Sequence, residues 1–199
     1  MHDDGINQAR RRFLTVATTG VGVVGAGFVA TPFVGAWNPS AKAKAAGAAV
    51  KVNISKIEMG SMIVVEWRGQ PIYIVRRSAQ MLDSLPNMTD RVSDPDSLHS
   101  IQPADCQNEW RSIKKEFLLL SGICTHLGCA VKNRFDVAPE DLGKSWLGGF
   151  FCPCHGSKYD LAGRVFKNVP APTNLTIPPY RYETDTTLVV GEAQKGAAA

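Results

Sequence analysis

The longest apolar stretch of the chain lies near its N-terminus. Residues 10–12 are arginines, residues 13–37 form an uncharged, Gly-rich run, and the next charged residue is Lys42. A helix of that length, rising about 1.5 Å per residue, can cross a hydrocarbon core of about 30 Å. The run contains Pro32, but proline and glycine are commoner in membrane helices than in soluble ones. Because the run is longer than the apolar core of a cleaved signal, we predict a retained transmembrane helix over 13–37.

Small side chains, mostly alanine with two lysines, dominate residues 38–50. A segment without large apolar side chains cannot bury one face against a core. We therefore predict a flexible tether that can coil into a helix or extend. An inert spacer is the alternative interpretation.

From residue 51 onward, short alternating or β-branched runs separated by turn signals replace the long apolar stretch, which is typical of antiparallel strands. We predict strands at 50–55, 63–65, 72–75, 117–120, 149–151, 158–160, 163–166 and 187–190. We also predict a turn at Arg68-Gly69, a short helix over 78–85 and an irregular polar insertion over 86–110. Residues 51–199 are thus expected to form one mainly β, antiparallel head domain.

The formal net charge of the chain is +4, and most of it comes from the N-terminus and the tether. The head itself carries nearly equal numbers of acidic and basic residues. Such a head lacks the basic footprint of a nucleic-acid-binding protein, so we expect no nucleic-acid partner.

Two short motifs contain most of the metal-binding residue types. CTHLGC at 124–129 and CPCHGS at 152–157 hold four of the 5 cysteines and two of the 4 histidines. Each motif offers one Cys and one His plus a further Cys, which suits a 2Fe-2S cluster with mixed Cys and His ligands. Structural zinc, which needs only four ligands, is an alternative. A disulfide pair with bystander histidines is another.

Together the two motifs resemble the cluster-binding boxes of Rieske iron–sulfur proteins. The resemblance implies a 2Fe-2S cluster with two cysteines on one iron and two histidines on the other, namely Cys124, Cys152, His126 and His155. It also implies a disulfide between Cys129 and Cys154. Two thiolates balance the positive charge of the oxidised cluster, whereas four would leave an excess negative charge, so such a cluster is easier to reduce.

Three further residues receive roles from the same resemblance. Ser157 and Tyr159 resemble the donors of hydrogen bonds to a bridging sulfide and to the sulfur of Cys124, contacts that stabilise the reduced cluster. Leu127 resembles an apolar lid over the cluster, although a lone leucine in a loop is also consistent with simple packing. Cys106 is left over, and we expect it to be buried or a free thiol.

The arginines followed by Phe13-Leu14 fit a twin-arginine export signal. The positive-inside rule places residues 1–12 in the cytoplasm and the head outside it. We therefore expect a single-pass protein of the bacterial inner membrane with a periplasmic head. Export after folding allows the cluster to be inserted first, and the disulfide then persists in the oxidising periplasm. A simple topogenic charge cluster is the alternative for the arginines.

The order of these segments resembles the Rieske subunit of bacterial ubiquinol-cytochrome c reductase. The anchor, the tether, the β head, both boxes and a Pro170-Ala171-Pro172 segment occur in sequence, with Val169 where that family usually has Gly. We expect His155 to take the quinol proton as the cluster takes one electron. The resemblance implies that the head then swings to a c-type cytochrome. It also implies cytochrome b, ubiquinol and the lipid membrane as partners in a dimeric complex, outside which the subunit is not active.

Other interpretations differ in the partner or in the metal. The small subunit of a periplasmic oxidoreductase such as arsenite oxidase also combines an export signal with such boxes. A soluble oxygenase ferredoxin lacks the spare cysteine pair and the export segment, so it fits less well. A zinc-stapled interaction domain would need no redox chemistry.

Overall fold

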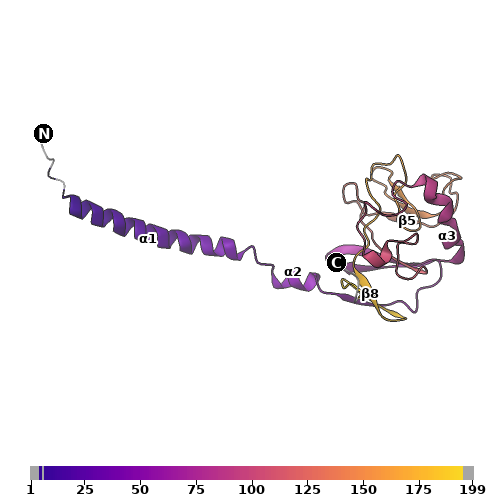
Figure 1. The fold of residues 1–199 in the computed structure, drawn as a ribbon, viewed down its shortest axis with the longest axis horizontal. Helices are drawn as coiled ribbons and strands as arrows, with labels where there is room; N and C mark the ends of the chain where they lie inside the picture. Colours follow the sequence, from indigo (N-terminus) through magenta and orange to yellow (C-terminus); the bar gives the residue numbers. More distant parts are fainter. Residues whose placement is uncertain (1–4, 6, 195–199) are drawn as a thin grey trace. The chain divides into compact units, whose positions relative to one another are not determined.

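The structure is a computed structural model that describes residue 5 and residues 7–194. Its contacts divide the chain into two units, Met1–Ala45 and Ala46–Ala199. Figure 1 shows the first unit as helical, while all the strands belong to the second. The site motifs lie in the second unit.

Helix α1 spans Gln8–Gly35 without interruption (Figure 1). The side chain of Asn7 caps it by accepting the backbone N–H of Arg10 at 3.1 Å. This cap precedes the arginines, and arginine favours helix, so the helix starts before the predicted span of 13–37. At its other end the helix stops at Gly35, two residues before Trp37. Within the described residues, α1 is the one helix long and apolar enough to cross a membrane. The membrane span over 13–37 itself stays a prediction.

The predicted tether contains a second, short helix, α2 (Ala41–Ala46). The hydroxyl of Ser40 accepts the N–H of Ala43 at 3.1 Å, which is the usual contact of a helix N-cap. Coiling within this segment agrees with its alanine and lysine content. Strand β1 begins at Val50, the last residue of the predicted tether.

The second unit holds three antiparallel sheets of three strands each. They are β1 (Val50–Asn53), β9 (Thr187–Val190) and β8 (Tyr180–Thr184); β2 (Met62–Trp67), β3 (Gln70–Arg76) and β4 (Phe117–Ser121); and β5 (Lys132–Arg134), β6 (Gly149–Phe151) and β7 (Lys158–Tyr159). The mainly β, antiparallel fold is therefore confirmed. The turn between β2 and β3 is confirmed too: Arg68 and Gly69 both have positive φ, 53° and 71°, as a two-residue hairpin with the sheet's twist requires.

One predicted strand is wrong. Residues 163–166 make only isolated bridges, Tyr159 to Val165 and Val92 to Phe166. The side chain of Asp160 accepts the N–H groups of Ala162 and Arg164, so it competes with a ladder for those donors. The segment is a turn held by a side chain. The short polar strand β5 and strand β8 were not predicted.

Helix α3 (Ala79–Ser84), capped by Ser78, agrees with the helix expected over 78–85. The insertion over 86–110 is irregular as predicted, apart from the 3₁₀ turns η1 (Pro86–Arg91) and η2 (Ala104–Cys106). The buried guanidinium of Arg77 donates to the carbonyls of Trp110 and Leu161 at 2.9 and 3.1 Å. Such donors satisfy buried carbonyls that no strand reaches.

The main core runs from the sheets into the base of both motifs. Strand β4 is buried along its whole length, and it leads into the first motif. Cys124, Cys152 and Tyr159 belong to the same buried cluster as the side chains of β3 and β4. The close packing of this core therefore fixes where the two motifs begin.

Candidate functional site

The two motifs form loops with the same backbone hydrogen bond. In the first loop, the N–H of Cys124 donates to the carbonyl of Cys129 at 2.8 Å. In the second, the N–H of Cys152 donates to the carbonyl of Ser157, also at 2.8 Å. Each loop therefore closes on the residue five positions after its first cysteine.

A glycine completes the turn in each loop. Gly128 and Gly156 donate their N–H groups to the carbonyls of Cys124 and Cys152, both at 3.0 Å. Their φ angles are 80° and 76°, a left-handed conformation that side chains disfavour. The spacing between cysteine and glycine thus serves the backbone of the loop, whatever the loop binds.

Each loop buries a thiol and holds an imidazole nearer the surface. The cysteines Cys124 and Cys152 are both 2% exposed. His126 is half-buried and His155 is exposed. The two rings meet edge to face with 5.0 Å between their centroids. Two sulfur and two nitrogen donors are therefore available from one pair of loops, and this donor set fits the mixed ligation of a Rieske-type cluster.

The hydroxyl of Tyr159 lies 3.2 Å from the sulfur of Cys124. Tyr159 is fully buried, and it also accepts the N–H of Thr125 at 3.3 Å. Burial raises the pKa of the Cys124 thiol, but hydrogen bonds from Tyr159 and from the backbone outweigh burial, so the pKa is lowered overall. For Cys152, burial dominates and the pKa is raised. The contact between Tyr159 and Cys124 is the pair that the sequence resemblance implied.

A proline-containing segment is hydrogen-bonded to both loops. The hydroxyl of Ser157, which is fully buried, accepts the N–H of Ala171 at 3.1 Å. The hydroxyl of Thr125 donates to the carbonyl of Thr173 at 2.8 Å. In this segment Asn168 takes the left-handed conformation, with φ of 60°. Sequence reasoning missed Thr125, although its place between a candidate thiol and a candidate imidazole was a usable signal.

Leu127 lies at the tip of the first loop and is 72% exposed. This exposure argues against simple packing in the core. Cys106 lies apart from the motifs, and it is buried and unpaired as expected. Its sulfur lies 3.7 Å from the hydroxyl of Tyr180.

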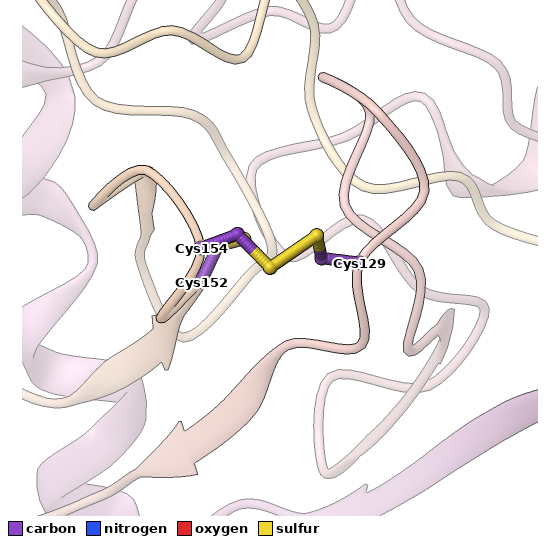
Figure 2. A group of neighbouring side chains, drawn as sticks. All are labelled: Cys129, Cys152 and Cys154. Atoms are coloured by element: carbon purple, nitrogen blue, oxygen red, sulfur yellow. A yellow bond between two sulfur atoms is a disulfide. The ribbon is translucent and has the colours of Figure 1, made fainter.

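A disulfide joins the two loops through Cys129 and Cys154, as predicted (Figure 2). The sulfur of Cys152 lies within 4.8 Å of both disulfide sulfurs. These three sulfurs do not make a metal site of their own, because two of them are already bonded to each other. Figure 2 shows Cys152 next to Cys154 on the second loop and Cys129 opposite them.

Comparisons with known proteins find relatives along the whole chain. Residues 98–180 match the family described as "Rieske [2Fe-2S] domain", and residues 1–40 match "Ubiquitinol-cytochrome C reductase Fe-S subunit TAT signal". The chain is 53% identical over 198 residues to the "Ubiquinol-cytochrome c reductase iron-sulfur subunit" of Allochromatium vinosum, covering 100% of this chain and 95% of the relative. The protein of the same name from Blastochloris viridis is 40% identical, with 94% and 96% covered.

Among solved structures, a chain of a "Hyperthermophilic respiratory Complex III" is similar at 24% identity with a TM-score of 0.46. That match covers 87% of this chain and 98% of the other.

The fold and the two loops define an iron–sulfur protein of the Rieske type, and its cofactor is a Rieske 2Fe-2S cluster. The interpretation of the motifs as a zinc site is therefore wrong. The chain belongs to the family of ubiquinol-cytochrome c reductase iron-sulfur subunits, in which its role is electron transfer. The export-signal match and the apolar helix fit a membrane-anchored subunit of a bacterial complex.

Proposed function

We propose that two thiols and two imidazoles ligate the cluster, the thiols on one iron and the imidazoles on the other: Cys124, Cys152, His126 and His155. The observation that carries this proposal is the pair of imidazoles 5.0 Å apart on the same two loops that bury the thiols. Metal-ligating imidazole is neutral and thiol is deprotonated, so this set supplies two negative charges. We propose Tyr159 as donor to the Cys124 sulfur and Ser157 as donor to a bridging sulfide.

When bound, the cluster would supply one-electron chemistry, for which we propose ubiquinol as the electron donor and a c-type cytochrome as the acceptor. His155 is the residue that receives the quinol proton, because its ring is exposed while His126 is half-buried. The proton is held on the ring nitrogen that does not ligate iron, and imidazole is the side chain best suited to exchange a proton near neutral pH. We propose the exposed side chain of Leu127, next to His126 in the chain, as the apolar lid over the cluster.

In the proposed arrangement, residues 1–12 are cytoplasmic, 13–37 span the inner membrane, 38–50 form the tether, and 51–199 form the periplasmic head. Helix α2 is far shorter than an isolated helix needs to be stable in water. Uncoiling its 6 residues would lengthen the tether by about 10 Å. Such a change would let the head move between cytochrome b and the c-type cytochrome of a dimeric complex.

Quinol oxidation also explains why this subunit would not act alone. Oxidation of ubiquinol releases two electrons, whereas a single 2Fe-2S cluster would have room for one. Cytochrome b in the same complex is the proposed acceptor of the other, which makes the whole complex the translocating enzyme.

Low-temperature EPR on membranes that contain the full complex tests the ligand assignment. After mild reduction with ascorbate, the wild-type protein should give the signal of a His-ligated 2Fe-2S centre. His155→Ala and Cys152→Ala should abolish the signal. His99→Ala and Cys106→Ser are the matched controls, since these residues lie outside the two loops, and both should keep it. A signal that survives in His155→Ala would remove that ligand from the assignment.

The same spectra test the contact with quinol. An inhibitor that occupies the quinol site should shift the signal of the wild-type protein. A spectrum indifferent to such inhibitors would leave the cluster in place and overturn the role of His155 as proton acceptor.

A further inference from the structure

A third sulfur lies beside the disulfide that joins the loops. The sulfur of Cys152 is within 4.8 Å of both Cys129 and Cys154 (Figure 2), and Cys152 is not in a disulfide. Cys124 is unpaired as well, but it does not belong to this group of neighbouring sulfurs. Cys152 is therefore the free thiol for which closeness to both disulfide sulfurs is established, whereas Cys124 does not lie within 4.8 Å of all three sulfurs.

We infer that, in a chain that has formed the disulfide without its cluster, Cys152 attacks the sulfur of Cys129. The bond between Cys129 and Cys154 breaks as a bond between Cys129 and Cys152 forms. Cys154 leaves as a thiolate and takes up the proton that Cys152 loses. One disulfide replaces another, so the exchange needs no external oxidant or reductant.

The position of the three cysteines favours attack on Cys129 over attack on Cys154. Only Pro153 separates Cys152 from Cys154, and a disulfide across a single rigid residue departs strongly from preferred geometry. Cys129 lies on the opposite loop, already held next to the second loop. Cys154 is exposed, so water can stabilise it as the leaving thiolate. Cys152 is buried, and we therefore expect exchange over hours, at the slow end of the range for disulfide reshuffling.

The exchange would close the site to the cluster. A Cys152 sulfur bonded to Cys129 has no thiolate left to offer to iron, whereas a Cys152 sulfur bonded to iron cannot attack a disulfide. This consequence rests on the proposed ligand role of Cys152. It makes the order of assembly decisive: the cluster must be inserted before the disulfide forms, and a head that loses its cluster in an oxidising compartment is trapped.

Two single variants of the full chain separate the attacking thiol from loss of the cluster. Cys124→Ser and Cys152→Ser each lose a proposed cluster ligand, but only Cys124→Ser keeps the thiol beside the disulfide. Each variant is incubated without reductant, and samples taken at intervals are unfolded in guanidinium with iodoacetamide present and then digested with trypsin. The relevant peptides cover 116–132 and 145–158, and fragment ions distinguish alkylation at 152 from alkylation at 154.

In Cys124→Ser we expect alkylation to move from Cys152 to Cys154 while one disulfide is retained. In Cys152→Ser the link between Cys129 and Cys154 should persist. Wild-type chain with its cluster should behave like Cys152→Ser, and wild-type chain stripped of iron with a chelator should behave like Cys124→Ser. The stripped wild type keeps the test valid if a variant folds poorly, which circular dichroism would reveal.

Persistence of the original link in both Cys124→Ser and the stripped wild type would overturn the inference. Equal exchange in Cys152→Ser would overturn it as well, because another thiol would then be the attacker. Iron content, measured on the same samples, reports the ligand assignment separately. If Cys124→Ser shows the exchange while Cys152→Ser keeps its full iron content, the proposed ligand role of Cys152 is overturned and the disulfide exchange is still supported.

Discussion

The loop over 124–129 and the loop over 152–157 share a backbone and differ in the side chains it carries. Both close through an N–H to carbonyl bond of 2.8 Å and turn at a left-handed glycine. Two residues after the first cysteine, however, the first loop has His126 and the second has Cys154. The second histidine, His155, comes one residue later and is more exposed.

This difference shows that the backbone of the loop and the chemistry of the loop are separate features. The two backbones share their main-chain hydrogen bonds and a left-handed glycine four residues after the first cysteine. Side chains at the remaining positions then decide that one imidazole is half-buried, that the other is exposed, and that a disulfide links the two loops. The two thiols are also unequal: among the hydrogen bonds of the described residues, the Tyr159 hydroxyl contacts the sulfur of Cys124 and not that of Cys152.

The largest expected effect comes from removing either imidazole. His126→Ala and His155→Ala should both lose the cluster completely, because each variant removes one of the two proposed nitrogen ligands. Iron content and visible circular dichroism measure the loss. A cluster retained in one variant only would show that the two loops do not contribute equally.

Removing the disulfide that joins the two loops should have the next largest effect. The disulfide closes a loop with a sequence separation of 25, so replacing both Cys129 and Cys154 by Ala should lower the free energy of unfolding by about 3 kcal/mol. Thermal unfolding of the complete subunit measures this change. Cys106→Ala is the matched control, as it removes a buried cysteine that makes no disulfide. An unchanged stability in the double variant would mean that packing alone holds the loops together.

The glycines test whether the two backbones are equivalent. A Cβ added at Gly128 or Gly156 would have no atom within 4 Å. Substitution by alanine is therefore unfavourable only because the backbone there is left-handed. Each should cost about 1–2 kcal/mol of unfolding free energy, and the two costs should be similar. Denaturant titration compares them. A much larger cost at one glycine would break the equivalence.

The smallest effect should come from the polar contacts. Tyr159→Phe removes one hydrogen bond to the Cys124 sulfur, which at about 1 kcal/mol lowers the reduction potential by about 40 mV. Ser157→Ala should retain the cluster at a lower potential as well. Redox titration followed by EPR measures both shifts, and Tyr180→Phe is a control tyrosine outside the loops. A potential unchanged in Ser157→Ala would remove Ser157 from the proposed donors.

Sequence reasoning succeeded where a local pattern was enough. The turn at Arg68-Gly69 follows from the two residues themselves, and the disulfide follows from the resemblance of the two motifs. It failed at residues 163–166, where the side chains of Asp160 and Asn174 accept the N–H groups of Arg164 and Val165. No periodicity records that competition, because it depends on polar side chains that accept backbone N–H groups in place of a neighbouring strand.

Two polar residues show the same limit within the site. Thr125 ties the first loop to Thr173, and Ser157 ties the second loop to Ala171, each across a separation that no spacing rule covers. These contacts exist because the core brings the segment after Pro170 against both loops. Their partners were therefore invisible in the sequence.

The sequence by itself determined the kind of molecule: an apolar N-terminal helix, a β head, and two motifs whose cysteines, histidines and glycines specify a Rieske cluster. These features depend on residue type and on short spacing, which a linear chain records. Only the tertiary structure decided that the two thiols differ, that Cys152 lies next to the disulfide, and that the rings of His126 and His155 meet edge to face. Such distances arise from packing of residues far apart in the chain, so they exist only once the core has formed.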